Sequence, residues 1–91
     1  MIFEYDPLKA YSNPLKHDQV SFDEAKSVFE DANAFYLPDE KHSTIHEVRE
    51  IVIGYSFYER RILVVFTERT QKTDPCPRIR IISARIYTGD M

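Results

Sequence analysis

The spacing of hydrophobic positions divides the chain into a helical first part and a second part built of strands. Apolar residues between Phe22 and Phe29 recur with the period of a helix. Ser21 precedes this run, and Glu24 stands three residues after Ser21. This spacing is typical of a capping box at a helix start. A helix that packs its apolar stripe on the core is therefore predicted from residue 22 onward.

An earlier helix is predicted from its first two residues. Asp6 is a residue type that caps helices, and Pro7 suits the first helical position, where a missing N–H costs nothing. Because Pro14 lacks the N–H that a helix interior needs, we expect it to break or distort this helix. Residues 2–5 come before it and are predicted to form a short edge strand.

The rest of the chain has the pattern of strands. Residues 48–57 place most of their apolar side chains on one face, whereas residues 61–69 are apolar on both faces and are expected at the sheet centre. The short link between them predicts an antiparallel hairpin. Residues 34–37 and 78–86 are further predicted strands. We expect an α+β fold in one domain, residues 1–91, with two N-terminal helices packed on a small antiparallel sheet.

Charge is unevenly divided along the chain. The formal net charge is −3, but residues 1–59 carry −7 and residues 60–91 carry +4. Six of the seven basic residues in the second part are arginine, which grips phosphate with a two-pronged fork. The asymmetry indicates a nucleic-acid or protein partner, and the alternative is a solvated sheet face with scattered salt bridges. The seven residues are Arg60, Arg61, Arg69, Lys72, Arg78, Arg80 and Arg85.

Cysteine and histidine usage limits other chemistries. Cys76 is the only cysteine, so a disulfide within the chain is excluded and a cytoplasmic protein is expected. No apolar run reaches the roughly 20 residues that cross a bilayer, and we expect no membrane contact. His42 and His46 have the spacing of metal ligands on a helix, but no third ligand is evident, and an exposed polar loop is the alternative. Neither a metal nor another cofactor is expected.

Polar side chains are concentrated on the last predicted strand. Strict alternation would divide them between the two faces of the sheet. A bulge near residues 81–82 would bring them all to one face, and bulges often re-aim side chains beside active sites. We predict such a bulge, and pairing with the preceding strand would then place Glu68 or Arg69 nearby. The alternative is an Arg–Glu ladder on an exposed sheet face. The side chains concerned are Arg78, Arg80, Ser83 and Arg85.

A series of short stretches follows one order along the chain. It runs from Tyr5-Asp6-Pro7 and Lys16-His17 through the segment 20–25 to the segments 61–65 and 80–85. Over residues 3–85 this series resembles the BrnT family of toxin ribonucleases. The resemblance implies a RelE-like fold and RNA cleavage without a metal ion, which inhibits translation. It also implies a ribbon-helix-helix antitoxin, similar to BrnA, through which promoter DNA would be bound only indirectly.

The sequence departs from the family pattern in four places, one of which is a loop containing residues 74–77 that is longer than expected between the last two strands. Tyr5 stands where the family has Trp. The family's Lys-His-Gly-Val becomes the stretch 16–20, with one extra residue and no glycine. The sequence stops at Met91, where the resemblance leads us to expect a charged C-terminal helix, so this helix is expected to be missing.

The mechanism is a hypothesis built on these residues. The RNA 2′-hydroxyl would attack the adjacent phosphate after Glu68 or His17 removes its proton, while arginines stabilise the negative charge that develops. Tyr5 would stack on a base. For His17, a capping or core-satisfying role is the alternative. The catalytic candidates are His17, Glu68, Arg69, Arg80 and Arg85, and the substrate-binding candidates are Tyr5, Lys16, Arg78 and Ser83.

A different class of function is compatible with the same residues. An acidic chain has to approach the phosphates of RNA against its own net charge. The second hypothesis is therefore a catalytically weakened module that mainly binds its antitoxin and contributes to transcriptional autoregulation. Direct DNA binding by this chain is not expected, because neither predicted helix is basic.

Overall fold

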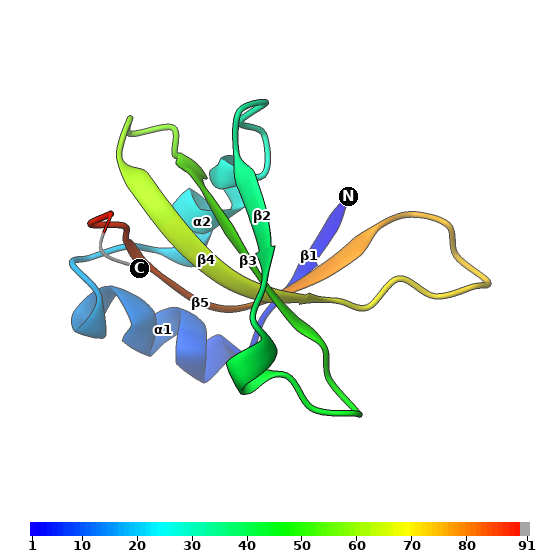
Figure 1. The fold of residues 1–91 in the computed structure, drawn as a ribbon. Helices are drawn as coiled ribbons and strands as arrows, with labels where there is room; N and C mark the ends of the chain where they lie inside the picture. Colours follow the sequence, from blue (N-terminus) through cyan, green and yellow to red (C-terminus); the bar gives the residue numbers. More distant parts are fainter. Residues whose placement is uncertain (90–91) are drawn as a thin grey trace.

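The structure is a computed structural model that describes residues 1–89, so Met91, where the sequence stops, lies outside the described residues. Two helices and five strands form an α+β fold, as predicted (Figure 1). In chain order the elements are β1 (Ile2–Glu4), α1 (Pro7–Lys16), α2 (Phe22–Val28), β2 (Phe35–Pro38), the 3₁₀ turn η1 (Glu40–His42), β3 (Arg49–Tyr55), β4 (Arg61–Glu68) and β5 (Arg78–Ile86).

The sheet has the strand order β1-β5-β4-β3-β2. Strands β2 to β5 form an antiparallel meander, which confirms the hairpin predicted between β3 and β4. The expectation of a wholly antiparallel sheet was wrong at one edge, because β1 pairs with the start of β5 in parallel. Both helices and strands β2 to β4 lie between β1 and β5 in the chain, so the connection is long enough for parallel pairing.

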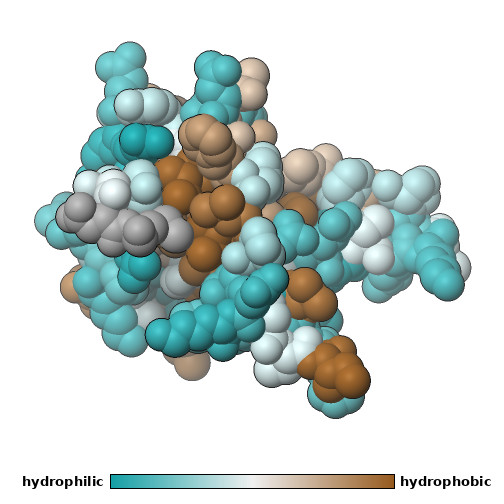
Figure 2. Space-filling view, viewed as in Figure 1, coloured by the Kyte–Doolittle hydropathy of each residue, from teal (hydrophilic) through white to brown (hydrophobic). Residues whose placement is uncertain are grey.

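The hydrophobic core lies between the helices and one face of the sheet. In Figure 1, α2 lies behind β3 and β4, so the viewer looks onto the opposite face, which the two helices leave open. Figure 2 shows apolar side chains gathered over the central strands of this open face, with hydrophilic side chains around them. The core residues are Val20, Phe22, Ala25, Val28, Val52, Ile62, Val64, Phe66, Ile79, Ile81 and Ala84.

Helix α1 lies along the edge of β5. Strand β1 pairs only with Arg78–Arg80, and beyond that point the side chain of Asn13 takes the place of a neighbouring strand. Its Nδ2 donates to the carbonyl of Ala84 at 2.8 Å, and its Oδ1 accepts from the N–H of Ala84 at 3.2 Å. Nδ2 also donates to the carbonyl of Val20 at 2.8 Å. Asn13 is buried, and it ties the end of α1 to the sheet.

The expected break of α1 at Pro14 does not occur. The helix continues to Lys16, because Pro14 stands in its last turn and removes only one hydrogen bond there. The apolar side chains at helical spacing on α1 point away from the core. Leu8, Tyr11 and Leu15 are 75–78% exposed.

Helix α2 begins as its sequence predicts, but only half of the capping box forms. Ser21 Oγ accepts the N–H of Glu24 at 3.0 Å. The Glu24 carboxylate is buried and does not bond to its own helix end. Both of its oxygens pair with Arg60 in the β3–β4 turn, and Ser56 Oγ donates to it at 2.6 Å. Burial acts to raise the pKa of Glu24, but hydrogen bonds from Arg60 and Ser56 and the charge of Arg60 outweigh it, so this pKa lies below its ordinary value.

Gly54 lets the loop after α2 approach β3. A Cβ at this position would lie 2.9 Å from Asp31 Oδ2 and 3.0 Å from Ala34 Cβ, closer than these atoms can stand without shifting. Asp31 Oδ2 accepts the N–H of Tyr55 at 2.8 Å, and Oδ1 accepts that of Asn33 at 2.9 Å. Glycine is therefore required because another chain segment lies where its side chain would be.

Candidate active site

The predicted bulge in β5 is confirmed. Val65 lies opposite Ser83 and Phe66 lies opposite Ile81, so Ile82 has no partner on β4. The extra residue changes the alternation in the middle of the strand. All four polar side chains of β5 consequently belong to the open face, away from the core. They are Arg78, Arg80, Ser83 and Arg85.

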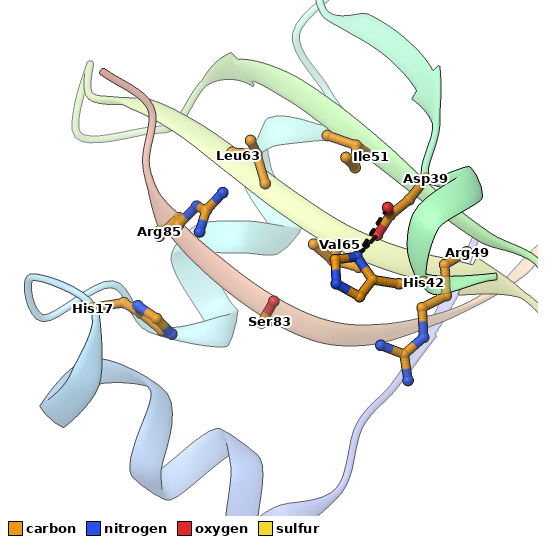
Figure 3. A pocket seen from close by; sticks show the side chains of 9 residues that line it. All are labelled: His17, Asp39, His42, Arg49, Ile51, Leu63, Val65, Ser83 and Arg85. Atoms are coloured by element: carbon orange, nitrogen blue, oxygen red, sulfur yellow. Dashed lines mark hydrogen bonds and ion pairs between the residues drawn. The ribbon is translucent and has the colours of Figure 1, made fainter. Parts of the chain in front are cut away.

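A groove of about 250 Å³ crosses this open face (Figure 3). Its floor is apolar and comes from the two central strands, whereas its polar side chains come from both ends of the sheet and from the segments beside it. An apolar floor with a few convergent polar groups is the usual composition of a ligand site. The lining residues are His17, Asp39, His42, Arg49, Ile51, Leu63, Val65, Ser83 and Arg85.

His17 reaches the groove from the end of α1. It is the C-cap residue, and its N–H donates to the carbonyl of Asn13 at 2.9 Å. The following residues Asp18 and Gln19 have φ of 52° and 60°, the left-handed conformation that glycine adopts most easily. Two consecutive residues other than glycine thus hold left-handed backbone in this turn. In Figure 3 the His17 ring points toward Ser83 and Arg85.

The opposite wall of the groove is the turn between β2 and β3. The carboxylate of Asp39 accepts from His42 Nδ1 at 3.0 and 3.1 Å for its two oxygens. Asp39 is buried, while the side chain of His42 is 59% exposed. Arg49 follows on β3, where its Nε donates to Glu47 Oε1 at 2.9 Å.

A second charged cluster, called here the arginine cluster, lies at the β1 edge of the same face. The carboxylate of Glu4 is 2.8 Å from Arg78 Nη1, 4.0 Å from Arg69 Nε and 4.0 Å from Arg80 Nη1. Hydrogen bonding with Glu4 is the largest contribution that raises the pKa of Arg78. Three guanidinium groups thus share the Glu4 carboxylate, and Arg78 has a second partner in Asp74, whose Oδ2 lies 3.6 Å from its Nη2.

One row of cross-strand neighbours connects the groove with the arginine cluster. Arg49 lies opposite Thr67, Thr67 opposite Arg80, and Arg80 opposite Glu4. This row holds two cations, Arg49 on β3 and Arg80 on β5, with the neutral Thr67 between them and the acidic Glu4 at the β1 edge. The two arginines suit neighbouring phosphates of a strand.

Not all predicted site residues meet in the groove. Glu68 lies opposite Ile79 at the end of β4, and its Oε1 accepts from Thr70 Oγ1 at 3.0 Å. It lines a hollow beside the arginine cluster, together with Glu4, Arg69 and Arg78, and not the groove. Tyr5 packs on the helical side, with its ring 5.6 Å from that of Phe22 and 5.2 Å from Lys26 Nζ.

The remaining predicted residues lie close to one of the two clusters. Lys16 lines a side hollow together with His17 and Ser83, next to the groove. Arg69, Arg78 and Arg80 form the arginine cluster, whereas Ser83 and Arg85 lie in the groove itself.

The two histidines considered as metal ligands do not share a helical face. Turn η1 ends at His42, which pairs with Asp39, and His46 lies in the exposed loop that follows, outside the groove. Residues 1–89 contain no group of three side chains placed to hold a metal ion. Cys76 is a free thiol in the β4–β5 loop. Within the same residues no helix is long and apolar enough to span a membrane.

A family model described as "Ribonuclease toxin, BrnT, of type II toxin-antitoxin system" matches residues 5–90, which is nearly the whole chain. The chain belongs to the BrnT family. No curated protein matches it. Membership in the BrnT family means kinship with ribonucleases that act as toxins, so RNA is the implied substrate and an antitoxin the implied partner.

Sequence reasoning missed part of the polar lining of this BrnT groove. Glu4 was not a candidate, because nothing in a three-residue strand shows that it will pair with β5. Arg49 falls within the strand predicted over residues 48–57, and no role was predicted for it. Asp39 and His42 stand three apart, and that spacing in a 3₁₀ turn was the available signal for their contact.

Proposed function

We propose that this BrnT family member is an endoribonuclease that cleaves RNA in the open-face groove without a metal ion, and that it inhibits translation by doing so. The observation that supports the site most directly is the meeting of His17, Ser83 and Arg85 in one groove with an apolar floor. These residues lie far apart in the sequence, and the Ile82 bulge is needed to bring the last two to this face.

The reaction fits the groups that line the groove. Attack of an RNA 2′-hydroxyl on the adjacent phosphate needs a proton acceptor and positive charge close to the phosphorus. Between the two expected bases, the geometry favours His17, because His17 lines the groove and Glu68 lines the hollow beside the arginine cluster instead. Histidine exchanges a proton near neutral pH, which suits this task.

Arginines supply the charge in this proposal. Arg85 and Arg49 flank the groove, and guanidinium groups in fixed positions stabilise negative charge that grows on a phosphate. Lys16 and the arginine cluster would bind neighbouring phosphates of the strand. In this arrangement protein cations take the electrostatic part that a metal ion plays in other nucleases.

We further propose a ribbon-helix-helix antitoxin, similar to BrnA, as the partner. It would cover the arginine-bearing open face and connect the complex to promoter DNA. A cytoplasmic location follows from this role, because the RNA of translation is found there.

A specific observation favours the second candidate function, an antitoxin-binding module with weakened cleavage. The Glu4 carboxylate already occupies the space among Arg69, Arg78 and Arg80. Guanidinium groups that are paired within the protein attract RNA less than free ones do. If this pairing dominates, the open face serves the antitoxin more than the substrate.

Cleavage of bulk RNA by the purified, antitoxin-free chain in the presence of EDTA tests the proposal. The parent should cleave, and His17→Ala and Arg85→Ala should each slow cleavage by about 100-fold or more, the usual loss when a proton acceptor or a charge-stabilising group is removed. Arg61→Ala is the matched control. This exposed arginine packs on Tyr87 outside the groove, so its loss should leave cleavage unchanged.

Two results would decide against the nuclease assignment. Folded parent protein that leaves RNA intact, with and without ribosomes, would favour the antitoxin-binding module. Cleavage that EDTA abolishes would contradict the metal-independent mechanism.

A further inference from the structure

The contact between Asp39 and His42 is a preorganised pair on the wall of the groove opposite α1. Both oxygens of the carboxylate lie within 3.0–3.1 Å of His42 Nδ1. A carboxylate in this position holds the Nδ1 proton and leaves the second ring nitrogen, Nε2, to act. Figure 3 shows the ring between Asp39 and the hollow, with that second nitrogen directed away from Asp39.

The backbone around Asp39 is fixed to the sheet. The N–H of Asp39 donates to the carbonyl of Arg49 at 3.0 Å, and Ser43 Oγ donates to the carbonyl of Asp39 at 2.7 Å. The same Ser43 Oγ accepts the N–H of Arg49 at 2.9 Å. The turn that carries Asp39 and His42 is thus anchored to the strand that carries a groove arginine. Such anchoring is what a proton-transfer group needs to keep its place.

Charged groups face His42 from several elements. Asp39 contacts it from the end of β2, and Arg49 stands beside it on β3 with Glu47 as partner. Across the groove are His17 at the end of α1 and Arg85 on β5. Of these groups, Asp39 is the one in direct contact with the ring.

RNA cleavage by the 2′-hydroxyl needs two proton transfers. As the bond from the 2′-oxygen to phosphorus forms, the bond from phosphorus to the 5′-oxygen breaks. The 2′-hydroxyl gives up a proton and the leaving 5′-oxygen takes one, so that the products are a 2′,3′-cyclic phosphate and a 5′-hydroxyl. His17 accounts for the first transfer and leaves the second without a donor.

We infer that His42, oriented by Asp39, is the general acid that protonates the leaving 5′-oxygen from the wall of the groove opposite His17. The inference rests on the proposed function, since it names a second catalytic residue for the same reaction. Asp39 is a positioning residue in this scheme, because it acts through the His42 ring. The two histidines divide the proton transfers between α1 and η1.

A substrate with a sulfur leaving group tests this role. The probe is a synthetic oligoribonucleotide that contains one linkage cleaved by the parent, prepared with either a 5′-oxygen or a 5′-sulfur at that linkage. A thiolate leaves without being protonated, because thiols are far more acidic than alcohols. His42→Gln should slow cleavage of the oxygen substrate by roughly 100-fold or more and cleavage of the sulfur substrate by less than about 5-fold.

Two further variants separate a chemical role from a structural one. His17→Ala should slow both substrates alike, because sulfur does not replace the base. Arg61→Ala, which lies outside both the groove and the arginine cluster, should cleave both at the parental rate. Asp39→Asn should slow cleavage of the oxygen substrate and spare that of the sulfur substrate, because the ring that Asp39 orients is needed only for the oxygen leaving group.

The outcomes distinguish the role of His42 from the proposed ribonuclease function on which it rests. A parent that cleaves neither substrate overturns both. A parent that cleaves both, with His42→Gln slowed equally on each or on neither, overturns only the role of His42 and leaves the nuclease assignment in place. Circular dichroism of each variant confirms that the compared proteins are folded.

Discussion

Two clusters of arginine and glutamate stand on opposite faces of the same sheet and differ in how far their charges are matched. On the helix-covered face, Glu24 is 1% exposed, and Arg60 and Ser56 donate to its two oxygens. On the open face, the half-buried Glu4 is shared among three guanidinium groups, two of them at 4.0 Å. The first cluster is saturated and closed, whereas the second has donors left over.

The difference shows how one pair of residue types serves two purposes. A buried carboxylate with complete hydrogen bonding contributes to holding α2 on the β3–β4 turn, and it has no capacity for a ligand. Spare guanidinium donors at a sheet edge add little to stability, because water screens them, but they attract anions. The two clusters have the same residue types. What distinguishes the structural cluster from the functional one is whether all its charged groups are fully hydrogen-bonded within the protein.

The largest effect is expected where the closed cluster is broken. Glu24→Gln removes the buried charge and leaves Arg60 without its partner. Because the Arg60 side chain is 34% exposed and remains partly hydrated, the free energy of unfolding should fall by about 2–3 kcal/mol, somewhat less than for a fully buried pair. Urea denaturation measures this loss.

The matched control for this variant is Asp23→Asn one residue earlier. Asp23 pairs with Lys26 at the surface, with its side chain 80% exposed, so the unfolding free energy should change by less than about 1 kcal/mol. Cleavage per folded molecule should be unchanged in both variants. Equal destabilisation by the two substitutions would contradict the contrast drawn between closed and open clusters.

A smaller change in the free energy of unfolding, also due to Glu24, is expected at acidic pH. Because the pKa of Glu24 is lower in the folded chain than in the unfolded one, its stabilisation is present above the ordinary glutamate pKa and is lost as pH falls through the folded value. The stability difference between the parent and Glu24→Gln should therefore narrow between pH 7 and pH 3. Urea midpoints measured across this range give the answer.

Acid sensitivity should not disappear in the Gln variant. The N–H groups of Tyr55 and Asn33 lower the pKa of Asp31, which contributes with the same sign. A parent–variant difference that stays constant or grows in acid would show that the Glu24 carboxylate does not stabilise the fold through its charge.

The smallest effect is expected when the open cluster is freed. Glu4→Gln removes the negative charge shared by the three arginines, so affinity for single-stranded RNA should rise by roughly 3- to 5-fold at low salt and return to the parental value at high salt. Glu59→Gln makes the same change in net charge at the exposed β3–β4 turn and should have less effect. Weaker binding by Glu4→Gln would mean that Glu4 organises the arginines instead of competing with RNA.

Local sequence rules predicted much of the fold. The β3–β4 hairpin, the cap by Ser21 and the bulge at Ile82 each follow from a few adjacent residues. The bulge could be predicted because it would bring four polar side chains of one strand to the same face. What failed depended on distant partners: the parallel pairing of β1, and the use of Glu24 by Arg60 rather than by its own helix end.

The site was predictable to a similar depth. The arginines of β5 and His17 were candidates from their types and from the family resemblance, and the groove brings His17 and Arg85 together. Glu68 had the expected chemistry, but its position at the end of β4 places it outside the groove, and register is set by pairing that the sequence does not display. The three-residue spacing of Asp39 and His42 was a signal for their contact, but it does not reveal that their turn is anchored to β3 beside the groove.

The extra residue in β5 determines which side chains of this strand face the groove. The Ile82 bulge sets the face of every side chain after it, because unbroken alternation through Ile82 would turn Ser83 and Arg85 toward the core and bring Ala84 to the groove. Deletion of Ile82 would instead leave a regular strand with Ser83 and Arg85 still on the open face. A mutation that removes the bulge but keeps its residue would therefore take both side chains out of the groove without replacing either of them.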